Sequence, residues 1–250
     1  MIALAVFDMA GTTIDDGGAV YRALEQAVVE TGVPVAAEDL QRWMGAEKRA
    51  AITALIELGG GDPTEPADAV DRAFARFRAL LAERYAAEPP TPIAGVPEAI
   101  TALRDAGVRV ALTTGFSREV AEGILRELDW SVGGDGGAED RGGDGGEPAL
   151  RIGEPALRID ALVCGDEVVA GRPAPYMIHR AMERTGVLDV AEVVVAGDTV
   201  VDVQAGAHSG AAASYGVLTG KLDRADFVGQ PATDLLESVA EIPARIARLG

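Results

Sequence analysis

Short runs of apolar residues alternate along the chain with longer segments in which apolar residues recur every three or four positions. The runs have the length of buried β-strands, and the longer segments have the spacing of amphipathic helices. This alternation is typical of parallel strands joined by crossover helices and predicts the α/β fold class. The expected strands are residues 2–7, 108–113, 161–163, 193–196 and 214–218, with a short strand near 226–228.

The first two expected strands are separated by about a hundred residues, too many for one crossover connection. Most of this stretch predicts helices, at 19–30, 37–43, 47–58 and 67–87. We therefore expect an inserted α-helical cap at 16–92 and a discontinuous core formed by 1–15 and 93–250. The expected linkers are 15–18 and the proline-rich 88–92, where helix propagation stops.

The segment 131–158 differs in composition from the rest of the chain. It is rich in Gly, Asp and Glu, and the heptapeptide Gly-Glu-Pro-Ala-Leu-Arg-Ile occurs at 146–152 and again at 153–159. Such a composition buries too little apolar surface to offset its ordering entropy. We expect a solvated, flexible surface loop with no assigned role, since the regular nonapeptide of calcium-binding repeats is absent.

Composition and charge exclude several classes of partner. The 250 residues carry a formal net charge of −18 with no Lys/Arg-rich run, which disfavours nucleic acid. The apolar runs are far shorter than the roughly 20 residues of a membrane helix, and no basic leader precedes the first expected strand. We expect a cytoplasmic protein without membrane contact. The single cysteine, Cys164, is interpreted as a small buried apolar residue.

Residues suited to catalysis follow the expected strands. Asp8 comes directly after the first strand, at the carboxyl edge where open α/β sheets bind ligands. Thr113, Thr114 and Gly115 end the second strand and offer hydroxyl and amide donors for an oxyanion. Taken alone, Asp8 could equally cap a helix, and a threonine pair is common in β-structure.

Two further groups lie later in the chain. Arg172 stands between Gly171 and Pro173 and could neutralise a phosphoryl oxygen, although a surface ion pair explains an isolated arginine equally well. Asp198 and Asp202 follow the fourth strand and are close enough in sequence to serve one hard cation such as Mg²⁺.

In their order and spacing, these four groups resemble the haloacid dehalogenase superfamily. The resemblance implies a Rossmann-like parallel-sheet core with a cap that closes over small substrates. It implies that Asp8 is a nucleophile that forms an aspartyl-phosphate, and that Thr113 and Arg172 bind the phosphoryl group. Mg²⁺ would be held by Asp8, the carbonyl of Ala10 and Asp198, with Asp202 in support. Because the family often pairs through its cap, a homodimer is also an open expectation.

Ala10 narrows the resemblance to one branch. Most phosphatases of the superfamily carry an acidic residue two positions after the nucleophile, which protonates the leaving alkoxide, and this chain has alanine there. In having alanine at this position, the chain is similar to the phosphonatase branch, which breaks a carbon–phosphorus bond. That branch uses a cap lysine to form an imine with an aldehyde substrate, and Lys48, four residues after Met44, matches its spacing.

Other residues support the same branch or depart from it. The run from Gly115 to Glu119 and the Gly-Arg-Pro around Arg172 resemble the phosphonatase motifs. Ala51 and Phe116 stand where that branch has a histidine and a tyrosine, and Gly18 stands near its cysteine, which leaves the identity of the aldehyde open. Neither His179 nor His208 is expected to replace the lost histidine, and both are interpreted as structural.

The expected function is therefore a Mg²⁺-dependent hydrolase that acts on a small phosphonate or phosphorylated aldehyde. Asp8 and Lys48 would be catalytic, and Thr113, Thr114, Gly115 and Arg172 would bind substrate. Two alternatives stay open. One is a phosphomonoesterase for a small metabolite, similar to phosphoglycolate phosphatase, and the other is a weakly catalytic protein that binds phosphate metabolites. An imine on Lys48 and a simple charge or solvent role for this lysine are also both open.

Overall fold

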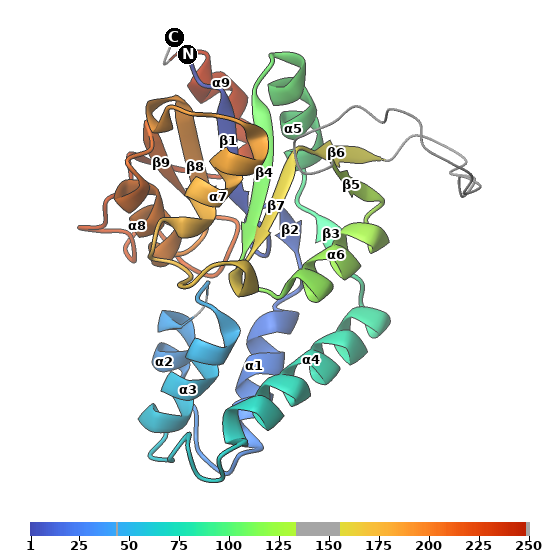
Figure 1. Ribbon diagram of the computed structural model, residues 1–250, viewed down its shortest axis with the longest axis vertical. Helices are drawn as coiled ribbons and strands as arrows, with labels where there is room; N and C mark the ends of the chain where they lie inside the picture. Colours follow the sequence, from blue (N-terminus) through green and yellow to red (C-terminus); the bar gives the residue numbers. More distant parts are fainter. Residues whose placement is uncertain (44, 134–155, 249–250) are drawn as a thin grey trace.

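The computed structural model of the protein describes residues 1–43, 45–133 and 156–248. Within these residues, a six-stranded parallel sheet forms the centre of an α/β core, with helices on both faces (Figure 1). This confirms the predicted fold class. The strands lie in the order β10, β9, β8, β1, β4, β7. Their bounds are β1 Leu4–Asp8, β4 Arg109–Thr114, β7 Ala161–Cys164, β8 Val193–Gly197, β9 Ala213–Val217 and β10 Asp234–Leu236.

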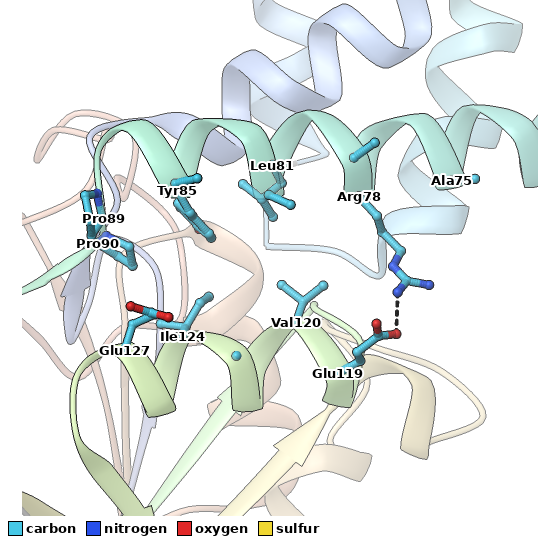
Figure 2. Close-up of a pocket in the computed structure, with 14 residues that line it drawn as sticks. Ala75, Arg78, Leu81, Tyr85, Pro89, Pro90, Glu119, Val120, Ile124 and Glu127 are labelled. Carbon is cyan, nitrogen blue, oxygen red and sulfur yellow. Dashed lines mark hydrogen bonds and ion pairs between the residues drawn. The ribbon is translucent and has the colours of Figure 1, made fainter.

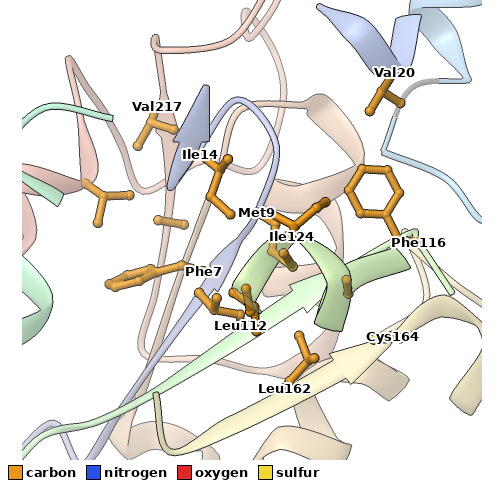
Figure 3. Packing of buried hydrophobic residues seen from close by; sticks show 14 of the residues in the cluster. Phe7, Met9, Ile14, Val20, Leu112, Phe116, Ile124, Leu162, Cys164 and Val217 are labelled. Atoms are coloured by element: carbon orange, nitrogen blue, oxygen red, sulfur yellow. The ribbon is translucent and has the colours of Figure 1, made fainter. Parts of the chain in front are cut away.

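Strand β1 lies in the middle of the sheet and is buried on both faces. Leu4 and Val6 pack in a core on one face, whereas Ala5 and Phe7 pack in a larger core on the other, part of which is shown in Figure 3. Because side chains alternate along a strand, both faces must be covered by helices. The chain first adds β4 and β7 on one side of β1 and then crosses to β8 on the other. The carboxyl ends of β1 and β8 therefore meet at a topological switch point.

The helices α1–α4, called the cap helices below, follow β2 (Ile14–Asp15) and lie beyond the carboxyl edge of the sheet (Figure 1). Their bounds are α1 Ala19–Val29, α2 Ala37–Arg42, α3 Lys48–Leu58 and α4 Ala69–Ala87. The chain returns through β3 (Thr91–Pro92), which pairs antiparallel with β2. The two connections to the cap helices thus run side by side. That 16–92 is a separate domain stays a prediction.

The remaining helices cover the sheet. They are α5 Val96–Asp105, α6 Arg118–Glu127, α7 Tyr176–Thr185, α8 Val200–Ser209 and α9 Ile242–Ile246, with short 3₁₀ turns at Gly165–Glu167, Val190–Glu192 and Val239–Glu241. No helix among the described residues is both long and apolar enough to span a membrane.

Two sequence expectations need correction. The strand expected near 226–228 is wrong, because Asp226 and Val228 make local backbone bonds to Asp223 and Ala225, and Val228 is largely exposed. The last strand is instead β10. The other expected strands and helices are present, with ends shifted by at most two residues.

The second correction concerns the ends of 131–158. Residues Trp130–Val132 form β5 and Leu157–Ile159 form β6, and these two strands pair in parallel. The ends are ordered because Trp130, Leu157 and Ile159 are buried in the core. The first heptapeptide and most of the segment lie outside the described residues.

Candidate active site

A pocket of about 250 Å³ lies where the cap helices face the carboxyl ends of β1, β4 and β8. Of the residues predicted for catalysis or binding, Asp8, Ala10, Lys48, Thr114, Gly115 and Asp198 line it. A larger hollow of about 680 Å³ lies elsewhere, between α4 and α6, and is bridged by an Arg78–Glu119 ion pair (Figure 2). None of the predicted site residues lines this second hollow. Arg172 lines a third hollow of about 740 Å³, whereas the other predicted residues that line a pocket all line the smaller one.

Asp8 ends strand β1 and is almost fully buried beside a cation. Nη2 of Arg172 lies 2.6 Å from Oδ1 of Asp8, and Nη1 of the same guanidinium pairs with Asp202. Burial raises the pKa of the Asp8 carboxyl to about 6; the Arg172 cation opposes this shift, whereas the charge of Asp202 adds to it. Arg172 is thus buried between two carboxylates, and it is not a surface ion pair.

The Asp198 carboxylate follows β8 and is packed between two glycines. An ideal Cβ on Gly11 would lie 2.4 Å from Oδ2 of Asp198, and one on Gly220 would lie 2.0 Å from the same atom. The Thr12 hydroxyl donates to Oδ1 at 2.9 Å. Burial, together with the charges of Asp8 and Asp202, raises the pKa of Asp198 well above its ordinary value. Carboxylates crowded together in this way favour the binding of a cation.

Asp202 lies beneath the pocket and does not line it. Its Oδ2 accepts from the backbone N–H of Thr199 at 3.0 Å, which caps the start of α8, and its Oδ1 pairs with Arg172. Gly197 allows this approach, because an added Cβ there would lie 2.3 Å from Cγ of Asp202. The position of Asp202 therefore suits it to hold Arg172 in place.

Lys48 begins helix α3 and turns its amine into the pocket. The preceding Glu47 caps this helix by accepting from the backbone N–H groups of Arg49 and Ala50. The Lys48 side chain is buried, and Nζ donates to the carbonyl of Ala46 at 3.0 Å. Burial, followed by the nearby Arg172 cation, lowers the pKa of Lys48 to about 8. At pH 7 roughly a tenth of this amine is therefore neutral and nucleophilic, far more than for an ordinary lysine.

The end of strand β4 forms another wall of the pocket. Thr114 accepts a hydrogen bond from the Phe116 N–H at 3.2 Å, and an ideal Cβ on Gly115 would lie 2.5 Å from the Ala46 carbonyl oxygen. Only glycine permits this contact between core and cap helices. Thr113 differs from its neighbours, because it does not line the pocket and its hydroxyl lies 3.5 Å from the Phe7 carbonyl oxygen.

The departures from the phosphonatase motifs fall in different places. Phe116 and Gly18 line the pocket, whereas Ala51 is buried within α3 and does not. Neither histidine lines it either. His179 contacts the Ser209 carbonyl oxygen at 3.2 Å, and His208 contacts that of Pro173 at 2.8 Å. Cys164 is buried in β7, where burial raises the pKa of its thiol.

Sequence reasoning missed several residues of the pocket. Tyr21, Thr199, Thr219 and Lys221 all line it, and Thr12 supports Asp198 from behind. One signal was available for Lys221. The chain contains only two lysines among its 22 basic Lys and Arg residues, and both line this pocket.

Known proteins resemble this chain in sequence and in fold. The model of the haloacid dehalogenase-like hydrolase family matches residues 2–210. A phosphonoacetaldehyde hydrolase of Bacillus cytotoxicus is 32% identical over 223 residues, which cover 84% of this chain and 73% of that protein. Among solved structures, a hydrolase from Pseudomonas syringae has a TM-score of 0.78 at 19% identity, covering 99% of both chains. A phosphonoacetaldehyde hydrolase-like protein from Oleispira antarctica has a TM-score of 0.73 at 20% identity, covering 99% of this chain and 92% of that one.

Proposed function

Because the chain belongs to the haloacid dehalogenase-like hydrolase family, we propose that it uses Asp8, Lys48 and a bound Mg²⁺ to cleave the carbon–phosphorus bond of a small phosphonate aldehyde. The observation that carries the proposal is a buried lysine with a lowered pKa in the same pocket as Asp8. The relative from Bacillus cytotoxicus, named phosphonoacetaldehyde hydrolase, supports the choice of substrate class.

The residues at the carboxyl edge fit a hard divalent cation. Asp8 and Asp198 supply carboxylate oxygens, and Ala10 lines the same pocket and offers its backbone carbonyl. Among the described residues, no group of three or more His, Cys, Asp and Glu side chains is placed to hold a metal. A set of two carboxylates completed by a carbonyl is consistent with that result. When bound, Mg²⁺ would neutralise charge on the phosphoryl oxygens.

Arg172, Thr114 and Gly115 would bind the phosphoryl group. Arg172 does not line the pocket, but its buried guanidinium lies beside Asp8, and its Nε has no hydrogen-bond acceptor among the described residues. Thr114 and Gly115 line the pocket and offer polar groups at its wall. A binding role for Thr113 stays a prediction.

The methyl group of Ala10 argues against an ester substrate. A phosphate ester leaves as an alkoxide, and a positioned acid that protonates it is typically worth about 10² to 10⁴ in rate. Alanine cannot donate a proton. A carbon leaving group needs an acceptor for its electron pair instead, and an imine on Lys48 would provide one.

The proposed reaction begins at Lys48. Its neutral amine condenses with the aldehyde, releases one water and takes up one proton, giving an iminium ion. The Asp8 carboxylate then attacks phosphorus. As the carbon–phosphorus bond breaks, its electron pair passes into the iminium and forms an enamine. Protonation and hydrolysis of the enamine release the aldehyde product and free Lys48, while a second water hydrolyses the aspartyl-phosphate to phosphate and free Asp8.

A comparison of two substrates tests this proposal directly. Phosphate release would be measured with phosphonoacetaldehyde and with phosphoglycolate, in the presence of Mg²⁺ and after chelation. We expect Mg²⁺-dependent turnover of the phosphonate and little of the ester. Lys48→Arg keeps the positive charge but forms no imine, and it should lower the phosphonate rate by about 10²-fold or more. Rapid hydrolysis of phosphoglycolate by this variant would instead support a phosphomonoesterase.

A further inference from the structure

The second lysine of the chain, Lys221, enters the pocket from a different segment than Lys48. It follows Gly220 in the turn after strand β9, whereas Lys48 belongs to cap helix α3. Arginine fills every other basic position, 20 of the 22. Both lysines line one pocket, but the proposed reaction uses only Lys48. The position of Lys221 therefore needs a separate explanation.

The backbone that carries Lys221 is fixed against the site. Gly220 packs so closely on Asp198 that an ideal Cβ would lie 2.0 Å from its Oδ2. The Thr219 hydroxyl donates to the carbonyl of Gly11 at 2.6 Å, which joins this turn to the loop after Asp8. These contacts therefore hold the backbone at Lys221 in place, next to Asp198 and the loop after Asp8.

The Lys221 amine lies over Gly18. An ideal Cβ built on Gly18 would be 3.7 Å from both Cε and Nζ of Lys221. A longer side chain at position 18 would occupy the space that the amine now uses. Because Gly18 has no side chain, the pocket has room for this ammonium group.

Lys221 is exposed, and its charge has no partner among the described residues. None of these residues forms a hydrogen bond or ion pair with its Nζ, although Asp15 and Asp16 line the same pocket. Both carboxylates are engaged by the backbone. Asp15 accepts from the N–H of Gly17 at 2.8 Å, and Asp16 accepts from the N–H groups of Gly18 and Val20 at 2.9 Å. Lys48 and Arg172, by contrast, both have protein partners.

We propose that Lys221 binds a carboxylate at the end of the substrate distant from phosphorus, so that the preferred substrate is a phosphonate α-keto acid, in which a ketone flanked by the carboxylate takes the place of the aldehyde carbonyl. This inference rests on the proposed function, because it places phosphorus at Asp8. An ammonium group with three donors suits such an anion. The anion would also meet a positive charge within a protein whose net charge is −18.

Two matched ligands separate the effect of the carboxylate from that of the carbonyl. 3-Phosphonopyruvate and phosphonoacetone are both phosphonate ketones and differ in having a carboxylate or a methyl group on the carbonyl carbon. Their affinities would be measured by titration calorimetry with Mg²⁺ in Lys48→Met, in which no imine can form on the catalytic lysine, so that binding is read without turnover.

We expect the keto acid to bind more tightly than the methyl ketone by about two- to fivefold, the range of one exposed ion pair. Adding Lys221→Met should bring this ratio close to one, and Lys221→Arg should restore most of it. A ratio that does not depend on position 221, or failure of both ligands to bind, would overturn the proposal. Turnover assays of the unaltered protein report separately on carbon–phosphorus cleavage, so a Lys221-dependent ratio without turnover would contradict only the proposed function.

Discussion

Nζ of Lys48 lies 5.7 Å from the centroid of the Phe116 ring, so that a cap helix and the core meet over the pocket. Both side chains are buried, at 3% exposure each. The ring helps to exclude water from the amine, and loss of hydration is the first cause of the lowered pKa of Lys48. Burial of the Lys48 amine at the start of a cap helix therefore depends in part on a residue of the core.

The pH dependence of turnover follows from this lowered pKa. In the proposed reaction the neutral amine attacks the aldehyde, and the fraction of neutral amine increases as the pH rises through about 8. We expect kcat/KM for phosphonoacetaldehyde to increase with pH, with an apparent pKa near 8, and then to level off. A profile that keeps rising to about pH 10.5, the ordinary value of lysine, would show that Lys48 is not desolvated in the working enzyme.

Removal of the nucleophile should stop hydrolysis and preserve the fold. Asp8→Asn has the same shape and cannot form the acyl phosphate, so we expect a loss of at least about 10³-fold in kcat. Phosphate release measures the rate, and thermal denaturation serves as the control for folding. Retention of activity in a well-folded Asp8→Asn protein would remove Asp8 from the chemistry.

The packing of Gly220 on Asp198 gives a prediction about metal binding. In Gly220→Ala the new methyl group would overlap Oδ2 of Asp198, so the carboxylate must move. We expect the Mg²⁺ concentration needed for half-maximal activity to rise by about 10- to 100-fold.

Gly123→Ala provides the matched control. Gly123 lies in helix α6, where an added Cβ has no neighbour closer than 3.9 Å, and alanine favours helix by about 0.5–1 kcal/mol. This variant should keep the Mg²⁺ dependence of the unaltered protein. Equal Mg²⁺ requirements in both variants would disprove the steric argument at Gly220.

Glu167 predicts a pH-dependent contribution to stability. Burial acts to raise its pKa, but hydrogen bonds from Arg184, the Cys164 N–H and Arg118 outweigh burial and lower the pKa to about 2. A carboxyl whose pKa is lowered on folding stabilises the protein above its ordinary pKa of 4.5 and loses this effect as the pH falls toward 2.

Glu167→Gln should accordingly lower the free energy of unfolding by about 1–3 kcal/mol near pH 7. Urea denaturation at several pH values would follow the difference between the two proteins, and we expect it to shrink below about pH 4.5. A difference that grows on acidification would contradict this account of the ionised carboxylate.

Much of the fold could be predicted because its signals are local. Buried strands such as β1 and β8 are short apolar runs, and the cap helices have strong periodicity. Strand β10 was missed because Asp234–Leu236 is a short edge strand with an exposed first residue, whereas the nearby Phe227 and Val228 have the composition of a strand.

Sequence patterns predict some residues of the pocket and not others. Asp8 and Asp198 could be placed because each follows a strand at the same edge of the sheet. Lys221 could not, because its position depends on how closely Gly220 packs on Asp198. That position 18 is a glycine is visible in the sequence, but the amine that lies above Gly18 comes from a turn some two hundred residues away.

The central claim, an imine on Lys48, is tested most directly by borohydride reduction in the presence of phosphonoacetaldehyde, followed by peptide mass spectrometry. The assay has an internal control, because Lys221 is the only other lysine in the sequence and would report nonspecific reduction. We predict an adduct on the peptide that contains Lys48, none on the peptide that contains Lys221, and loss of the adduct in Lys48→Arg. Absence of an adduct at Lys48 during active turnover, or an adduct at Lys221 alone, would contradict the account.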